Sequence, residues 1–184
     1  SPGTHALIPS FDGAIEFIVF GISDKPNLWD WAFIPSRLPP GLYKLSQKIQ
    51  GNSANSIALA WALDTYQFNK YKSSKVTKPR LIKPPKFDEN EAIAIYLVRD
   101  LINTPANDMG PNDLSKAASE LARKLNAKFY EIVGEELLKQ GYPSIHAVGR
   151  AHDRAPRLID IRWGNPKSPK ITLIGKGVCF DTGG

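Results

Sequence analysis

The chain has 184 residues, enough for one ordinary domain or for one small domain and part of another. Its composition, 42% hydrophobic and 23% charged, is typical of a globular protein and excludes an intrinsically disordered one. No apolar run approaches the roughly 20 residues that a membrane-spanning helix needs, so we expect no membrane association. The single cysteine, Cys179, excludes an internal disulfide and indicates a reducing, cytoplasmic protein.

The net charge is +6, and an excess of this size raises the question of a polyanionic partner. The lysines are scattered, apart from a mild concentration between Lys70 and Lys86 in KYKSSKVTKPRLIKPPK. That stretch contains no motif that reads a groove or stacks on bases. Its prolines indicate a solvated linker, so nucleic acid is not an expected partner.

The first half of the chain predicts two strands, a helix and a short extended piece. Residues 5–21, HALIPSFDGAIEFIVFG, predict a hairpin, because Asp12-Gly13 tolerates the positive φ of a tight turn. An aromatic and Pro-rich connection, residues 27–45, follows. Residues 52–68 place Ile57, Trp61 and other apolar side chains at a helical period. Residues 78–87 contain prolines that stop any helix and predict an extended segment.

A second block begins at Asp88, in DENEAIAIYLVRDLIN. Asp88 and Glu91 have the spacing of a capping box, which predicts the start of a helix. That helix is apolar around much of its circumference, and we expect it to be buried between two bodies of protein. It should end near Thr104-Pro105, because a residue before proline disfavours helical ψ.

The remaining elements alternate between helix and strand. A helix is predicted over residues 111–125, with proline at its first position. Residues 127–134 and 157–164 predict strands, separated by a short helix closed by Gly141 and a loop-like stretch around AVGRA. Residues 170–177, KITLIGKG, predict a continuous apolar strand. This alternation indicates an α/β protein with a mostly parallel sheet.

Three stretches occur in order and together resemble the leucine aminopeptidase family, peptidase family M17. They are RDLINTPANDMGP (residues 99–111), GYPSIHAVGRAHDRAPRLIDIRWG (residues 141–164) and LIGKGVCFDTGG (residues 173–184). The last is similar to the metal-binding signature of that family. The first half of the chain resembles the variable amino-terminal domain of the family only loosely, and we expect the beginning of that domain to be missing.

The resemblance implies a domain organisation. Residues 1–87 would form a small amino-terminal α/β domain, residues 88–103 a connecting helix, and residues 104–184 the first part of an α/β catalytic domain. The family's other metal-binding carboxylates, its catalytic lysine and its catalytic arginine lie further along, so we expect no catalytic residue within this chain. The chain would then be a fragment that is inactive alone.

The resemblance also implies a function. Family members are cytoplasmic enzymes, typically homohexamers, that remove amino-terminal residues from peptides with two divalent metal ions. Manganese, zinc and magnesium are all plausible metals. Carried onto this sequence, Lys176 matches the lysine that ligates one metal, and Asp181 matches the aspartate that bridges both. The expected partners are peptides with a free amino terminus and further copies of the same chain.

The residue types suit that chemistry. Strands of an open α/β sheet deliver ligands at their carboxyl ends, where the pattern places Lys176. An amine binds a metal only through a free lone pair, and a nearby dication and partial burial both favour its neutral form. A carboxylate such as Asp181 bridges two cations at the roughly 3.5–4 Å typical of two-metal hydrolases. The glycines around both residues allow close backbone approach.

The sequence allows other interpretations of its function and of the VCFDTGG stretch. A non-catalytic assembly or regulatory module is the main alternative function. VCFDTGG also resembles the Asp-Thr-Gly of aspartic proteases, which are all-β, and the phosphate loops of sugar kinases and actin, which lie near the start of their domain. A Walker-type loop is excluded, because Gly177 follows Lys176. We expect His5, His146 and His152 to be structural or surface residues, and Cys179 to be a small buried hydrophobe.

Overall fold

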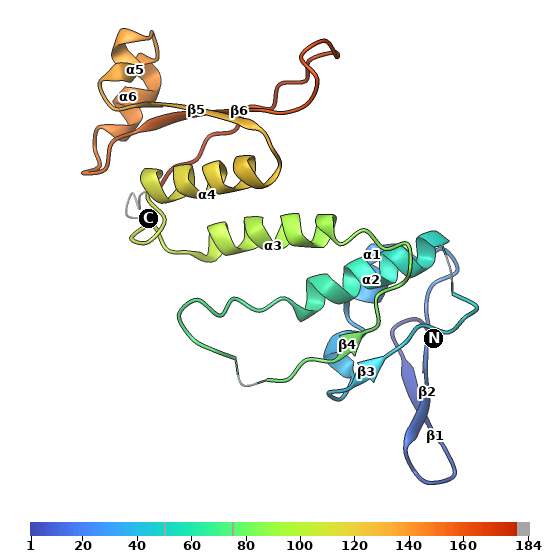
Figure 1. The fold of residues 1–184 in the computed structure, drawn as a ribbon. Helices are drawn as coiled ribbons and strands as arrows, with labels where there is room; N and C mark the ends of the chain where they lie inside the picture. The colour runs from blue at the N-terminus through green and yellow to red at the C-terminus, as the bar shows by residue number, and fades with distance from the viewer. Residues whose placement is uncertain (50, 75, 180–184) are drawn as a thin grey trace. The chain divides into compact units, whose positions relative to one another are not determined.

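The computed structural model describes residues 1–49, 51–74 and 76–179. The chain divides into two compact units, Ser1–Asp100 and Leu101–Gly184, called here the first and the second unit. Helices and strands occur in both (Figure 1), which confirms the α/β class. Within the described ranges, no helix is long and apolar enough to cross a bilayer.

The first unit begins with the predicted hairpin. Strands β1 (His5–Pro9) and β2 (Ile15–Phe20) pair antiparallel, with Leu7 opposite Ile18. Gly13 in the turn has φ +84°, a value that favours glycine. The Asp12 carboxylate accepts a hydrogen bond of 3.1 Å from Ala14 N. The Asp-Gly turn therefore acts as the sequence predicted.

The aromatic and Pro-rich stretch after the hairpin contains elements that we did not predict: α1 (Leu28–Ala32), a 3-10 turn η1 (Pro35–Arg37) and β3 (Leu42–Tyr43). Asn27 and Asp30 form a reciprocal cap, in which Trp29 N donates to Asn27 Oδ1 at 2.8 Å and Asn27 N to Asp30 Oδ2 at 2.7 Å. The cap and the burial of Trp31 stabilise a helix too short for its periodicity to be read.

Helix α2 (Gly51–Thr65) packs on α1 and confirms the predicted helix. Its Trp61 indole donates to Pro79 O at 3.0 Å inside the core. This bond anchors the extended piece that contains β4 (Arg80–Leu81), which pairs parallel with β3. One buried apolar cluster of the unit contains Trp31, Ile34, Leu38, Ile57, Ala60 and Trp61, and a second contains Leu59, Leu63 and Ala92.

Helix α3 (Asn90–Asn103) differs from the buried helix that we expected. Asp88 Oδ1 accepts from Asn90 N at 3.0 Å, so the helix begins slightly later than a cap at Asp88 implies. Only Ala92 of α3 is buried among the described residues, whereas Ile93, Val98 and Ile102 are exposed. Arg99 Nη1 donates to Leu63 O at 2.8 Å and thereby attaches the helix to the end of α2.

The second unit contains α4 (Pro111–Lys124), β5 (Lys128–Val133), α5 (Glu136–Lys139), α6 (Pro143–Gly149) and β6 (Arg157–Arg162). Helix α4, β5, α5 and β6 were predicted. Helix α6 corrects the loop-like interpretation around AVGRA: Pro143 at its first turn favours a helix start, and Gly141 (φ +83°) ends the preceding helical stretch.

The strand pairing differs from the mostly parallel sheet that we expected. Strands β5 and β6 pair antiparallel, with Tyr130 opposite Asp160, as do β1 and β2, and only the short β3–β4 pair is parallel. In the described part of the chain, the sheets have two strands each.

The predicted apolar strand over residues 170–177 is wrong for this structure. These residues have no regular secondary structure, and the side chains of Ile171, Leu173 and Ile174 are almost fully exposed. The composition is that of a buried strand, but a strand exists only through hydrogen bonds to a neighbour. The described residues offer no such neighbour to this segment.

A charged cluster joins three elements of the second unit. The Glu131 carboxylate on β5 accepts from the buried Ser115 Oγ on α4 at 2.6 Å and from Arg157 Nη1 on β6 at 2.8 Å. The Ser115 hydrogen bond, followed by the Arg157 hydrogen bond, lowers the pKa of Glu131. A carboxylate with a lowered pKa stabilises the fold while it is ionised.

We therefore predict that Glu131→Gln lowers the free energy of unfolding at pH 7 by about 1 kcal/mol, a value discounted because Glu131 is partly exposed. The folded-state pKa lies below the unfolded one, so the contribution is complete above the ordinary Glu value of 4.5 and is lost as the pH falls below it. Denaturant unfolding of wild type and variant at several pH values measures this difference. Glu120→Gln, at an exposed position of α4, is the control. A difference that persists unchanged at about pH 3 would contradict the assignment.

Candidate metal-binding segment

Lys176 lies on the irregular segment that follows β6. Its side chain is exposed, and the residues that the structure describes give it no ion pair. Asp181, the second predicted metal ligand, falls outside the described residues. Whether the two residues meet is therefore not shown, and both assignments remain predictions.

The segment contacts helix α4 of its own unit just beyond Lys176. Ile174 is 93% exposed, whereas the exposed fraction falls to 47% at Val178 and Cys179 is half-buried. A Cβ placed on Gly177 would lie 3.3 Å from Leu114 Cδ2 on α4, while one on Gly175 would meet nothing within 4 Å. The chain therefore comes to lie against α4 at Gly177, one residue after the candidate ligand.

Burial raises the pKa of the Cys179 thiol, and the negative charge of Asp113 raises it further. A thiol with a raised pKa is a poor nucleophile at neutral pH. This agrees with our interpretation of Cys179 as a packing residue.

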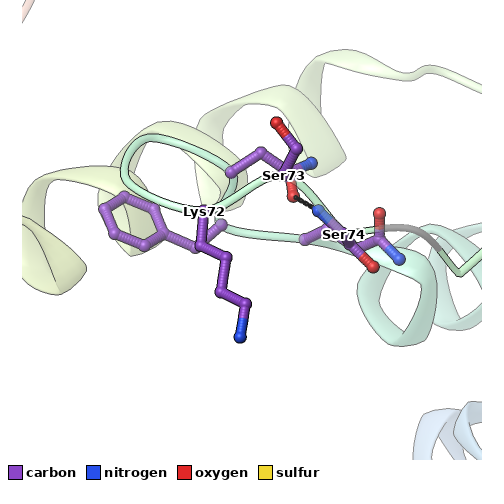
Figure 2. Close-up of a pocket in the computed structure, with 6 residues that line it drawn as sticks. Lys72, Ser73 and Ser74 are labelled. Atoms are coloured by element: carbon purple, nitrogen blue, oxygen red, sulfur yellow. Dashed lines mark hydrogen bonds between the residues drawn. The ribbon is translucent and has the colours of Figure 1, made fainter.

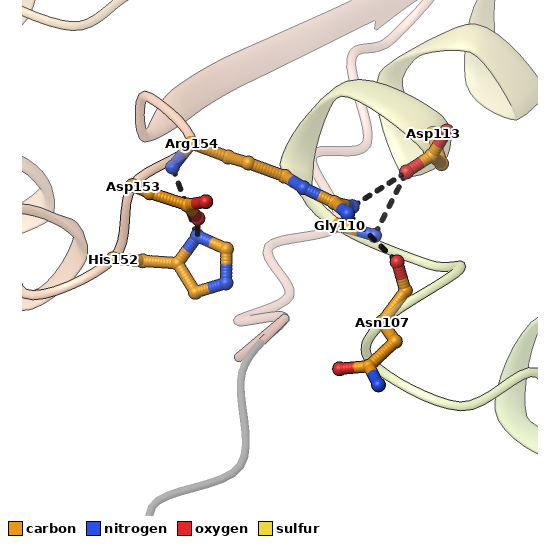
Figure 3. A network of polar contacts seen from close by, with 6 residues as sticks. All are labelled: Asn107, Gly110, Asp113, His152, Asp153 and Arg154. Carbon is orange, nitrogen blue, oxygen red and sulfur yellow. Dashed lines mark hydrogen bonds and ion pairs between the residues drawn. The ribbon is translucent and has the colours of Figure 1, made fainter.

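Polar contacts hold the first turn of α4 to a loop that is distant in sequence (Figure 3). Asp113 Oδ2 accepts from Gly110 N at 3.0 Å and from Arg154 Nη1 at 3.1 Å. The same guanidinium donates through Nη2 to Asn107 O at 2.7 Å. An acidic residue in the first turn also interacts favourably with the helix dipole. One arginine thus fixes both the helix start and the turn before it.

None of the three histidines belongs to a metal-like cluster. His5 stacks on Phe20, with ring centroids 5.5 Å apart, and His146 Nε2 lies 3.0 Å from Glu135 Oε1. His152 Nδ1 lies 2.9 Å from Arg154 N and 2.8 Å from Asp153 Oδ1 (Figure 3). The described residues contain no group of three or more His, Cys, Asp or Glu side chains placed to hold a metal ion.

Two pockets are alternative candidates for a functional site. One lies in the loop after α2 and is lined by Gln67, Phe68, Asn69, Lys72, Ser73 and Ser74; there Ser74 N donates to Asn69 Oδ1 at 3.0 Å (Figure 2). Among the described residues that line it, Lys72 carries the charge. The other is an apolar crevice against the core residues Trp31 and Trp61. Neither gathers groups suited to acid–base or metal chemistry.

The donor chemistry fits a divalent metal in part. The Lys176 amine has no carboxylate partner among the described residues, and Asp181 follows five residues later in the sequence. Nitrogen and carboxylate donors suit zinc and manganese. The described residues provide one candidate ligand, so a complete site needs donors from elsewhere.

The fold and this segment define an α/β protein that carries a candidate metal-binding loop, and comparison with known proteins identifies its family. The model described as "M17 aminopeptidase, N-terminal domain" matches residues 1–84, and the model described as "Cytosol aminopeptidase family, catalytic domain" matches residues 96–184. The chain belongs to the M17 cytosol aminopeptidase family.

Curated relatives are longer than this chain. It is 35% identical over 161 residues to Peptidase B of Yersinia pestis (strain Pestoides F), covering 78% of this chain and 37% of the relative. It is 31% identical over 157 residues to a "Probable cytosol aminopeptidase" of Sinorhizobium medicae (strain WSM419), covering 74% of this chain and 31% of the relative. The chain thus spans about a third of the length of these relatives.

Solved structures agree with this assignment. A crystal structure of the cytosol aminopeptidase from Coxiella burnetii matches with a TM-score of 0.89 and 40% identity, over 97% of this chain and 40% of that one. The bottromycin maturation enzyme BotP in complex with Mn matches with a TM-score of 0.68 and 23% identity, over 90% of this chain and 40% of that one. The second match shows similarity of fold alone.

Sequence reasoning did not single out Arg154 or Asp113. The Pro111 signal located the helix start, and Asp113, in its first turn, is a residue that a search for capping side chains would have found. The ion pair between Asp113 and Arg154 joins residues that are 41 positions apart, and no local sequence pattern predicts such a pair.

The tight approach of Gly177 to Leu114 gives a testable prediction. Gly177→Ala should push the segment away from α4 at a cost of about 1 kcal/mol, whereas Gly175→Ala meets open space and should have no such effect. Alkylation of Cys179, the single cysteine, reports on this packing. We expect alkylation about fivefold faster in Gly177→Ala than in wild type.

The matched variant Gly175→Ala serves as the control and should react at the wild-type rate. Equal rates in wild type and Gly177→Ala, or equal acceleration in both variants, would contradict the contact with α4.

Proposed function

We propose that the protein to which this chain belongs is a metal-dependent aminopeptidase that removes amino-terminal residues from peptides. The observation that carries the proposal is the match of the M17 catalytic-domain model to residues 96–184, a range that includes Lys176 and Asp181. The names of the relatives, cytosol aminopeptidase and Peptidase B, support the same reaction class.

In this proposal Lys176 and Asp181 hold divalent metal ions, with Lys176 on one ion and Asp181 between two. Manganese, zinc and magnesium suit these donors, and the manganese complex of BotP is consistent with the first. When bound, such ions act as Lewis acids toward the scissile carbonyl and bind the free amine of the substrate. The residues of this chain bind and orient the ions, and the general acid–base groups come from outside the chain.

The proposal extends to assembly and compartment. A homo-oligomer, a hexamer by family resemblance, is in keeping with exposed apolar side chains such as Phe17 and Ile102, which need a covering surface. We propose a cytoplasmic location, which the names of the relatives support.

The two candidate ligands differ in importance. In the full-length protein we predict that Asp181→Ala lowers kcat/KM by about 1,000-fold and Lys176→Ala by about 100-fold, because the former carries charge and touches both ions. Metal content, measured by elemental analysis, should fall toward zero in Asp181→Ala and to about half in Lys176→Ala.

Lys170→Ala, at an exposed lysine on the same segment, is the matched control and should behave as wild type. Equal losses in the two ligand variants, or a larger loss in Lys176→Ala, would rule out the bridging role of Asp181.

The 184-residue chain alone should show no aminopeptidase activity. Of the groups that the resemblance implies, it has two metal ligands and none of the catalytic side chains. A chromogenic leucine amide incubated with the purified chain and manganese is expected to be hydrolysed at the blank rate, with the full-length protein as positive control. Metal-dependent hydrolysis above the blank by the chain would refute this prediction. No activity in the full-length protein either would favour an assembly or regulatory module.

A further inference from the structure

The segment that carries Lys176 depends on α4 for its position. Residues 171–174 are exposed, whereas a Cβ on Gly177 would lie 3.3 Å from Leu114 Cδ2 in the first turn of α4, and Cys179 is half-buried. The orientation of the amino-terminal end of α4 therefore decides where the chain that follows Lys176 is placed.

That end of α4 is fixed from outside the helix by Arg154. The guanidinium makes contacts on both sides of the helix start, to the Asp113 side chain at 3.1 Å and to Asn107 O at 2.7 Å. Figure 3 shows the side chain reaching from its own loop across the helix terminus, with Gly110 between its two contacts. A planar guanidinium is suited to such a two-point clamp, because its donors have a fixed relative geometry.

The close approach of the two elements explains the glycine at this position. A Cβ on Gly110 would lie 2.7 Å from Arg154 Cδ and closer still to Nη1, so any other residue must displace the arginine. The backbone of Gly110 has φ −79°, a value that all residues adopt. Glycine is therefore needed here for space and not for its conformational freedom.

We propose that Arg154 is a positioning residue for the metal-binding segment: it locks the start of α4, against which Gly177–Cys179, the described residues after Lys176, lie. This inference rests on the proposed function for its catalytic consequence. Its structural part, that Arg154 holds residues 177–179 in place, is independent of any metal.

The structural part is tested by cleavage with a lysine-specific protease. Cleavage after Lys176 requires Gly177–Cys179 to leave α4 and enter the protease, whereas cleavage after Lys170 uses the already exposed residues 171–173. The ratio of the two cleavage rates, measured by mass spectrometry on the 184-residue chain, thus reports on the position of the segment. Because this enzyme cleaves only after lysine, replacing an arginine by alanine neither adds nor removes a cleavage site.

Arg154→Ala should raise this ratio about fivefold, as expected for the loss of a partly exposed charged clamp. Gly110→Ser should raise it similarly, since its side chain displaces Arg154 while serine still caps the helix well. Arg162→Ala, which removes an exposed ion pair to Asp160, is the control and should leave the ratio unchanged. A ratio within about twofold of wild type in both Arg154→Ala and Gly110→Ser overturns the inference.

The catalytic consequence is tested in the full-length protein without substrate. The dissociation constant for Mn²⁺, obtained from the electron paramagnetic resonance signal of the free ion, should rise about tenfold in Arg154→Ala and Gly110→Ser, as for other residues that orient ligands. It should stay at the wild-type value in Arg162→Ala. An unchanged constant in both test variants contradicts the positioning role. If wild type itself binds no Mn²⁺, the proposed function fails, and the cleavage ratio still decides the structural inference.

Discussion

The ion pair between Asp113 and Arg154 is the contact on which the arrangement of the candidate site depends. Both side chains are partly exposed, and an isolated pair of this kind contributes little to stability. Its effect here is geometric: the carboxylate also accepts from Gly110 N, and the guanidinium also donates to Asn107 O, so both ends have fixed orientations. The start of α4, and with it the surface under Gly177, is set by these bonds.

The same unit uses a second carboxylate in a similar way. Glu131 joins β5 to Ser115 of α4 and to Arg157 of β6, so that α4 is held at its first turn by Asp113 and two residues later through Ser115. The strand pair alone would be marginally stable, because two strands bury little apolar surface. Polar contacts to α4 supply the additional constraint that gives this unit a defined structure.

Much of the local structure could be predicted from the sequence, because its causes are local. The Asp12-Gly13 turn and Pro111 at the start of α4 each act within a few residues, and the hairpin and the helix formed as expected. The reciprocal cap of Asn27 and Asp30 is also local, and it would have revealed α1 had it been read as a helix start. The prediction of a strand over residues 170–177 was wrong for the opposite reason. Its apolar pattern predicts a strand, but pairing requires a partner that local sequence does not specify.

The candidate site also combines residues that the local sequence suggests with residues whose contacts are distant in sequence. Lys176 and Asp181 were predicted from the resemblance of the signature to the M17 family, and metal chemistry is compatible with these donors. Arg154 could not be found in this way, because its role comes from a contact across 41 residues. Side chains that the pattern predicts to be buried, such as Ile102 and Leu173, are exposed among the described residues. Covering each would add roughly 2 kcal/mol of hydrophobic stabilisation.

The central claim is that Lys176 and Asp181 bind the metals of an aminopeptidase. An anomalous difference map from crystals of the full-length protein soaked with Mn²⁺ tests it most directly. The account predicts two peaks about 3.5–4 Å apart, one beside Lys176 Nζ and both in contact with the Asp181 carboxylate. Peaks elsewhere, on histidines or on other carboxylates with Lys176 and Asp181 unoccupied, would contradict it.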